Sequence, residues 1–455
     1  MKRYEKYKPS GVEWLGEVPE EWDIERTKFN FEFSKGLTIT KENLIDEGIP
    51  CVNYGEIHSK FGFEVNPEIH DLKFVSDDYL KYPATLLKKG DFIFADTSED
   101  VKGSGNFTYL NSDIPTFAGY HTIIARLRKN HNPRFLAYVF DSDAFRNQIR
   151  TQIKGVKVFS ITQAILKNTF IWLPQIEEQI AIVNYLDKKT EKIDRLISHQ
   201  QALLEKLSEK RTALITETVC GRVRLPKALN DNETLSGSNA PLRNSGIEWL
   251  GEVPEHWEIK RLKFVGKLQG GIGFPHDYQN IQDLELQFYK VGDLGLSKNN
   301  RNMPKAQHTI NNEVANLLGA KIIPPNSILY AKVGAALLLN RRRINDEKCC
   351  IDNNMTAFIP DFSNITTAWA FYSLSIIDFK VFVNPGAIPS LSEGYQENLQ
   401  ICVPPLEEQM AIVNYLDKKT EKIDRLQHKI ECVIERLKEY RSALITQVVT
   451  GKVKV

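Results

Sequence analysis

Several short polar loops of this 455-residue chain carry side chains that can bind nucleic acid. Lysine and arginine bind phosphate oxygens, and arginine, asparagine and serine also form hydrogen bonds with base edges in the grooves of DNA. These loops lie in two segments, block one (residues 30–169) and block two (residues 265–399). The candidate DNA contacts are Lys102, Ser104, Asn106, Lys154, Lys157 and Ser160 in block one, and Lys290, Lys332, Arg341, Arg342, Arg343, Asn353, Asn354 and Ser390 in block two. The alternative for each residue is an ordinary solvated loop.

The charge of the whole chain does not reveal a DNA-binding surface. The 59 lysines and arginines almost balance the 58 aspartates and glutamates, for a net charge of +1. Any such surface must therefore be local. One candidate is the segment 330–348, where the basic residues outnumber the acidic ones and favour contact with phosphates.

Motifs for catalysis are absent from the sequence. It contains no GxxxxGK[ST] phosphate loop, no Asn-Pro-Pro-aromatic methylation motif and no acidic cluster followed by lysine. The six cysteines show no CxxC spacing, and the longest apolar run, residues 333–339, is far too short to span a bilayer. We therefore expect a non-catalytic cytoplasmic protein with no metal site and no cofactor of its own.

Two internal repeats position the blocks. Residues 181–196 recur letter for letter as residues 411–426, and the neighbouring Glu-Glu-Gln motif recurs with them. A second repeat opens each half, since head one (residues 10–29) resembles head two (residues 245–264). The blocks between these repeats are barely similar. The chain therefore consists of a head, a variable block and a helix, followed by a second set of the same three parts.

The repeated segment predicts one long helix in each half. Apolar residues at 3.5 spacing over four or more heptads are typical of a coiled coil, and about 40 residues would make a helix about 60 Å long. The alternative is an amphipathic helix packed on its own domain. The expected seam consists of Leu186, Ile193, Leu207 and Leu214 with Ile182, Leu196 and Leu203, and in the second helix of Leu416, Ile423, Ile430, Leu437 and Leu444 with Ile412, Leu426, Val433 and Tyr440.

Connectivity predicts how the helices pair. The first helix leaves block one and ends shortly before head two, and pseudo-twofold symmetry makes the second helix run back. We expect an antiparallel pair that holds the blocks apart, with a loose polar stretch over residues 1–9. The expected segments are 1–175 (head one and block one), 176–222 (first helix), 223–244 (flexible linker), 245–403 (head two and block two) and 404–455 (second helix).

Both blocks mix strand-like and helical stretches without the regular alternation of a doubly wound sheet, which indicates an α/β (α+β) fold. Block one suggests strands over 49–53, 91–95 and 121–127 and helices over 133–150 and 161–168; block two suggests strands over 287–291, 327–332 and 354–359 and a helix over 366–382. The predicted architecture is two pseudo-twofold-related mixed α/β domains separated by a long antiparallel two-helix coiled coil.

Polar residues of the two helices are also identical, although seam packing does not require them to be. Such a surface would suit two copies of one partner. The candidate partner contacts are Asn184, Asp187, Lys188 and Glu191 in the first helix and Asn414, Asp417, Lys418 and Glu421 in the second.

The order of these parts resembles that of the specificity (S) subunit of type I restriction–modification systems. The resemblance is strongest in the Trp-Leu-Gly-Glu-Val-Pro motifs from Trp14 and Trp249 and in the Pro-Pro-Leu-Glu-Glu-Gln motif from Pro404. Residues 330–340 and 386–392 resemble two further loops of the family, and residues 155–161 are a looser version of the second loop.

This resemblance implies that each block is a target recognition domain that reads one half of a bipartite, interrupted DNA site. It implies that the helices set the half-site spacing and dock two modification (methyltransferase) subunits, which a restriction/translocase subunit then joins. S-adenosylmethionine, ATP and Mg²⁺ are expected on those partners and no cofactor on this chain. The alternative is a coiled-coil scaffold whose two blocks bind protein or RNA.

Overall fold

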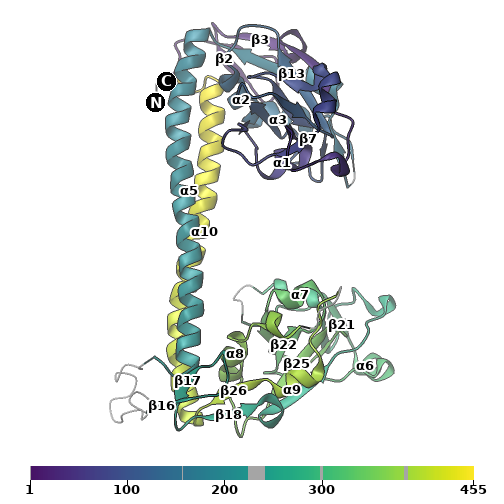
Figure 1. The fold of residues 1–455 in the computed structure, drawn as a ribbon, viewed down its shortest axis with the longest axis vertical. Coiled ribbons are helices and arrows are strands. Elements are labelled where there is room, and N and C mark those ends of the chain that lie inside the picture. Colours follow the sequence, from purple (N-terminus) through teal and green to yellow (C-terminus); the bar gives the residue numbers. More distant parts are fainter. Residues whose placement is uncertain (1, 156, 224–240, 298–300, 384–387) are drawn as a thin grey trace. The chain divides into compact units, whose positions relative to one another are not determined.

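The computed structural model describes residues 2–155, 157–223, 241–297, 301–383 and 388–455 (Figure 1). The chain forms two compact units: unit 1 comprises Met1–Gln201 and Glu431–Val455, and unit 2 comprises Ala202–Ile430. Each unit holds one head, one block and a segment of each long helix, so the division crosses the helices instead of following their ends. Most of the expected linker, residues 224–240, lies outside the described residues.

Block one is built from short strands: β4 (Phe31–Lys35), β5 (Ile49–Val52), β6 (Glu64–Val65), β7 (Lys73–Val75), β8 (Leu86–Leu87), β9 (Phe92–Ala95), β10 (Thr97–Ser98), β11 (Phe107–Leu110), β12 (Thr116–Ala118), β13 (Thr122–Leu127) and β14 (Phe159–Ser160). Five of them form a sheet in the order β4-β13-β9-β11-β6, which is antiparallel except that β6 runs parallel to β11. A second sheet has the order β7-β5-β12-β8. The strands expected near 49–53, 91–95 and 121–127 are confirmed.

The helices of block one are α1 (Tyr54–Ser59), α2 (Pro133–Asp141), α3 (Asp143–Arg150) and α4 (Gln163–Asn168). The single helix expected over 133–150 is wrong, because Ser142 has an extended backbone and its hydroxyl accepts a hydrogen bond from Phe145 N at the start of α3. α2 packs on the five-stranded sheet through Phe140, whose ring meets Phe92 edge to face at 4.9 Å. Full burial of each such side chain contributes about 1.5–3 kcal/mol.

Block two has its own strands: β19 (Gly266–Gly270), β20 (Leu286–Tyr289), β21 (His308–Ile310), β22 (Ile328–Ala331), β23 (Arg342–Ile344), β24 (Cys349–Ile351) and β25 (Met355–Pro360). They form sheets ordered β19-β25-β22-β23 and β21-β20-β24. The helices are α6 (Asn312–Leu318), α7 (Ala335–Leu338), α8 (Thr367–Ser375) and α9 (Glu393–Asn398). The helix expected over 366–382 stops at Ser375, and a separate 3₁₀ turn covers Phe379–Phe382.

Each head closes onto the end of its block. The head strands are β1 (Tyr7–Pro9), β2 (Glu17–Pro19) and β3 (Asp23–Arg26) in unit 1, and β16 (Leu242–Asn244), β17 (Glu252–Pro254) and β18 (Glu258–Arg261) in unit 2. β3 pairs antiparallel with β15 (Phe170–Leu173), and β18 pairs in the same way with β26 (Gln400–Val403), directly before the long helices. The loose stretch expected over residues 1–9 is wrong for residues 7–9, because β1 pairs with β2.

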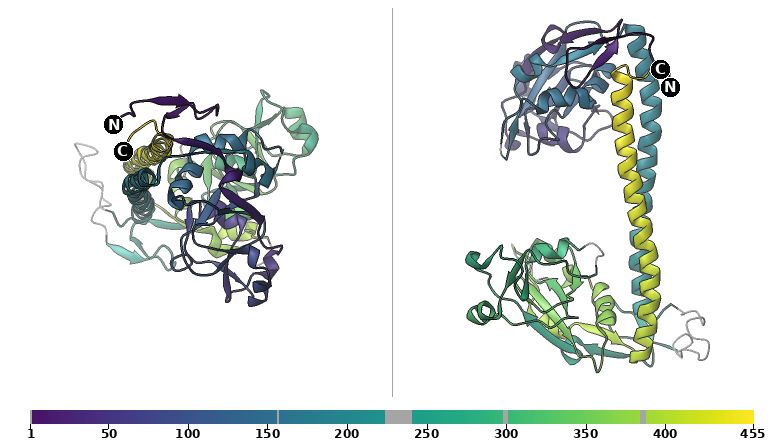
Figure 2. Two further views of the ribbon diagram at one scale, coloured as in Figure 1. Left: turned by 90° about the horizontal axis from the view of Figure 1, so that it is seen from above. Right: turned by 180° about the vertical axis from the view of Figure 1, so that it is seen from behind.

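The long helices are α5 (Ile176–Val219) and α10 (Leu406–Val449), each of 44 residues. Within each unit their segments run side by side in opposite directions (Figure 2). In unit 1, Arg441 Nε of α10 lies 2.9 Å from Asp194 Oδ1 of α5. In unit 2 the equivalent pair, Arg211 Nε and Asp424 Oδ1, is 2.8 Å apart. The antiparallel pairing of the two helices is therefore confirmed within each unit, and the two units make equivalent arginine–aspartate contacts.

One half of the expected seam is wrong by one residue from Leu196 and Leu426 onward, although its first members, Ile182 and Ile412, are buried. Buried and half-buried residues follow a four-three spacing along α5: Leu186, Thr190, Ile193, Ile197, Gln200, Leu204, Leu207, Arg211 and Leu214. By contrast, Leu196 and Leu426 are each 49% exposed and Tyr440 is 54% exposed. Thr190 on this stripe faces block one: its hydroxyl lies 3.2 Å from that of Tyr138 in α2 and donates to Leu186 O over 2.9 Å, which leaves no unpaired buried donor.

Each long helix is followed by a glycine at the equivalent position. The backbone of Gly221 has φ +73° and that of Gly451 has φ +69°, in the left-handed region that favours glycine. A Cβ atom at Gly221 would lie 2.4 Å from Pro254 Cδ, and one at Gly451 would lie 2.3 Å from Pro19 Cδ. The glycine therefore both ends the helix and lets the head proline pack against it.

Candidate nucleic-acid interface

The two candidate loops of block one lie side by side. The first follows the central strand β9, and its short strand β10 pairs antiparallel with β14 so that Thr97 faces Ser160. Ile161 N donates to Asp96 O over 2.8 Å and extends the contact. Two segments about 60 residues apart in the sequence thus form one surface.

Block two builds the same arrangement from different residues. After its central strand β22, Val333 forms a bridge with Ser390, and Leu391 N donates to Lys332 O over 2.9 Å. Lys332 N also donates to Asn354 O over 2.8 Å. The structure therefore brings together Lys332, Asn354 and Ser390, three of the candidates. Residues 386–387 of the second loop lie outside the described residues.

The candidate residues differ in exposure. Exposed residues are Lys102, Lys154, Lys157, Ser160, Arg341 and Asn353, and half-buried residues are Asn106, Lys290, Lys332, Asn354 and Ser390. Lys290 is already bonded within the block, since its Nζ donates to Gln279 Oε1 over 3.1 Å. The exposed set agrees with a surface role, and its contact with DNA stays a prediction.

The loop of residues 102–106 is held by hydrogen bonds within block one. Ser104 is fully buried, and its hydroxyl donates to Asp100 O over 3.2 Å. Asn106 Nδ2 lies 2.9 Å from His58 Nδ1, while Asn106 Oδ1 accepts from Arg146 Nη1 over 2.8 Å. The surface position expected for Ser104 is therefore wrong, and the polar groups of Asn106 serve the block itself.

Two of the three consecutive arginines are also buried. Arg342 belongs to β23, is 3% exposed and donates to Ile377 O over 2.6 Å, with its guanidinium 4.0 Å from the centre of the Phe379 ring. Arg343 is 5% exposed and donates to Arg342 O over 2.7 Å. Burial lowers the pKa of Arg342 to about 9 and that of Arg343 to about 10. The exposed loop expected for both is wrong, and only Arg341 of the three is exposed.

Comparison with known proteins decides what these paired domains are. A family model described as the type I restriction modification DNA specificity domain matches residues 19–206 and again residues 254–436. The chain belongs to this family. It carries two copies of the specificity domain, and each copy includes one block, which we now call a target recognition domain.

Relatives support the same assignment over the whole length. The type I restriction enzyme MjaIX specificity subunit of Methanocaldococcus jannaschii is 22% identical over 455 residues, which cover 97% of this chain and 95% of that protein. The MjaVIII specificity subunit of the same organism is 25% identical over 221 residues, covering 48% of this chain and 49% of that protein.

The fold is shared with a solved structure described as the "structural basis underlying complex assembly and conformational transition of the type I R-M system". It matches with a TM-score of 0.67 at 19% identity, covering 96% of this chain and 99% of that one. Among the residues described for this specificity subunit, no helix is both long and apolar enough to span a membrane.

The repeated Glu-Glu-Gln motif anchors each target recognition domain to its helix, a role that sequence reasoning missed. Gln179 Oε1 accepts from Asn132 N over 2.9 Å at the start of α2, and its Nε2 donates to Pro174 O over 2.9 Å. Gln409 makes the same bond with Thr366 N, at the start of α8, over 2.9 Å. The identical spacing in both halves is the signal that could have revealed this anchor.

The preceding glutamate of the motif binds the head. Glu178 accepts hydrogen bonds from Tyr4 OH over 2.6 Å and from Trp22 Nε1 over 3.2 Å. In unit 2, Glu408 is 2.9 Å from His256 Nε2. The motif therefore joins the head, the recognition domain and the helix at one point of each unit.

Of the eight candidate partner contacts on the two helices, six are exposed to solvent and two are half-buried. Exposed members are Asn184, Lys188, Glu191, Asn414, Lys418 and Glu421. Asp187 and Asp417 are half-buried and bind their own recognition domains, since Asp187 accepts from Tyr138 and Asp417 accepts from Tyr372. Their identity in the two helices thus has an explanation within the chain, and partner binding stays a prediction for the six exposed residues.

Proposed function

We propose that each target recognition domain reads one half of a bipartite, interrupted DNA site. The supporting observation is that both domains bring the same two loops together after the central strand, yet equip them with different residues. In the first domain Thr97 faces Ser160, and in the second Lys332 joins Asn354 and Ser390. The same loop arrangement with different side chains suits two domains that bind different DNA sequences.

We further propose that this chain is a non-catalytic scaffold for two modification subunits and a restriction/translocase subunit. The helices carry exposed apolar side chains at positions beside the seam, in unit 1 at Leu196, Val433 and Tyr440 and in unit 2 at Leu203 and Leu426. These side chains could pack against a protein partner, which would cover their exposed apolar surface. S-adenosylmethionine, ATP and Mg²⁺ would be bound by those partners, and the site of action is the cytoplasm.

Exchange of one recognition domain tests the reading function. Residues 30–169 are replaced by the same block of another specificity subunit, and the variant is co-expressed with its modification subunit. Because the block joins the rest of the chain through repeated ends, methylome sequencing should find one half of the methylated motif changed and the other half kept.

The wild-type complex is the control for this exchange. A gel-shift with duplex DNA containing the methylated motif should give a complex that an RNA competitor does not displace. Preferential RNA binding, or a change in both half-sites after the exchange, would favour the alternative of a coiled-coil scaffold that binds protein or RNA.

A further inference from the structure

A tyrosine and a carboxylate join each target recognition domain to its long helix. In unit 1 the hydroxyl of Tyr138 donates to Asp187 Oδ1 over 2.6 Å, and in unit 2 the hydroxyl of Tyr372 donates to Asp417 Oδ1 over 2.6 Å. Burial and the adjacent carboxylate raise the pKa of both tyrosines, that of Tyr372 to about 12. Each hydroxyl therefore stays protonated and can act as a donor at neutral pH.

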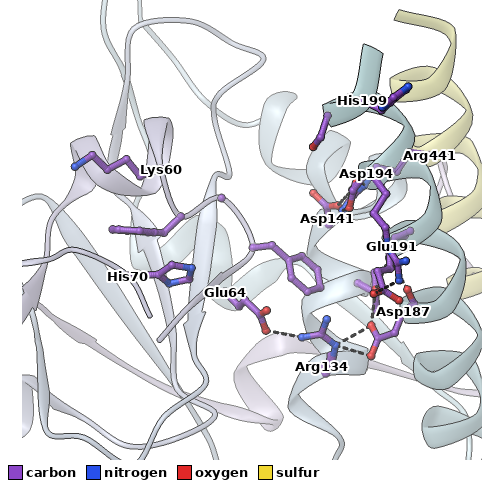
Figure 3. A pocket seen from close by; sticks show the side chains of 17 residues that line it. Lys60, Glu64, His70, Arg134, Asp141, Asp187, Glu191, Asp194, His199 and Arg441 are labelled. Atoms are coloured by element: carbon purple, nitrogen blue, oxygen red, sulfur yellow. Dashed lines mark hydrogen bonds and ion pairs between the residues drawn. The ribbon is translucent and has the colours of Figure 1, made fainter. Parts of the chain in front are cut away.

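An arginine completes each site, but the two units take it from different places. Arg134 of α2 places its Nε 2.8 Å from both carboxylate oxygens of Asp187 (Figure 3). The matching position of α8, four residues before its tyrosine, is Ala368. Unit 2 instead uses Arg301, which precedes β21 and places Nη1 2.6 Å from Asp417 Oδ1. Two dissimilar blocks thus reach the same contact by different routes.

The surroundings explain why this contact matters for orientation. A pocket of about 1070 Å³ lies between the first recognition domain and the helices, so apolar packing does not fill this side (Figure 3). Arg134 lies at the edge of this pocket and connects block one with α5. Its Nη1 donates to Glu64 Oε2 of β6 over 2.5 Å, and its Nε donates to Asp187 of α5. The guanidinium also lies 5.4 Å from the centre of the Phe63 ring, which restricts its position.

We propose that Asp187 and Asp417 are positioning residues that fix the angle of each recognition domain on its helix, and that each variable block must supply its own arginine to bind them. The carboxylates belong to the repeated helices and the arginines to the blocks. A block is therefore exchangeable only when some part of it delivers an arginine to this point. This inference rests on the proposed function, because the angle matters only if the loops read DNA.

The first test measures the angle without DNA. Spin labels at Glu68→Cys in block one and Lys192→Cys on α5, in a Cys432→Ser background, report the distance between the domain and the helix. Arg134→Met should broaden the distance distribution. Arg128→Met is the matched control, because Arg128 pairs with Glu32 inside block one, 3.7 Å away, and does not reach the helix. An unchanged distribution for Arg134→Met would overturn the proposal.

The second test measures reading in the assembled complex. Arg301→Met should reduce the methylation rate of the bipartite site roughly tenfold, since small misplacement of positioned groups lowers rates strongly. Adding Ala368→Arg to Arg301→Met should restore the rate, because position 368 corresponds to that of Arg134. Full activity of Arg301→Met would refute the positioning role. Lack of any site-specific methylation by the wild-type complex would instead refute the proposed function, while the spin-label result would still stand.

Discussion

At the scale of single residues, burial separates the neighbouring arginines of the second recognition domain into two roles. Arg341 is exposed, whereas Arg342 donates to the backbone carbonyls of Asn340 and Ile377. Arg341→Ala should therefore weaken DNA binding across all sequences and reduce the slope of its salt dependence by about 1, with no change in melting temperature.

Arg342→Ala is the informative contrast, because it removes two hydrogen bonds of a buried guanidinium, to Asn340 O and Ile377 O, each worth about 1.5–3 kcal/mol. Its melting temperature should fall. Salt-dependent binding series and thermal melts of both variants measure these effects. Equal melting temperatures, with equal loss of DNA binding, would mean that the two arginines play the same role.

Sequence reasoning found the loops but could not rank the residues within them. Three consecutive arginines look equivalent in a sequence, and only the pairing of β23 with β22 buries two of them. The same limit applies to the helix carboxylates. Nothing in the sequence links Arg301 to the role of Arg134, because the two residues occupy different elements. Side-chain contacts between distant segments need the assembled fold.

At the scale of elements, the two helices and their antiparallel pairing followed from the exact repeat, but the seam did not follow from hydrophobicity alone. Thr190 and Arg211 occupy seam positions, while apolar Leu196 and Leu203 lie beside the seam. A polar residue is tolerated there when its polar group is bonded: Thr190 bonds to its own helix and Arg211 to Asp424. Apolar patterns therefore placed half of the seam one residue too early.

The neighbouring pair Ile197 and Leu196 tests this corrected seam. Ile197→Ala removes a half-buried side chain between the helices and should cost about 1–3 kcal/mol of stability in urea unfolding. Leu196→Ala removes a similar volume but from an exposed position, so its free energy of unfolding should stay within about 0.5 kcal/mol of the wild-type value. It should instead weaken co-purification with the modification subunit. Greater destabilisation by Leu196→Ala than by Ile197→Ala would restore the seam predicted from the sequence.

At the scale of the whole molecule, the sequence predicts a chain of interchangeable parts, and the contacts within each unit agree. The head strand pairs with the strand before the helix, and the Glu-Glu-Gln motif binds both the head and the recognition domain. The strand pairing and the glutamine contact use backbone groups of the head and the block, so they survive divergence of the blocks, whereas the glutamate binds Tyr4 and Trp22 in one head and His256 in the other. The contacts at the ends of each block repeat, whereas the strands, the loops and the source of the arginine differ between the blocks.

The continuity of α5 and α10 through 44 residues each makes them the natural ruler for the spacing between half-sites. Inserting one heptad into both helices, after Leu204 and Ile434, keeps the four-three seam in phase and adds about 10 Å, or about three base pairs at 3.4 Å each. Methylome sequencing of a host carrying this variant should find both half-site sequences unchanged and the gap between them longer by about three base pairs. A two-residue insertion at the same points is the control, because it turns the following residues by about 200° around the helix, takes them off the seam and should abolish site-specific methylation. An unchanged gap with full activity in the heptad variant would mean that the helices do not set the spacing.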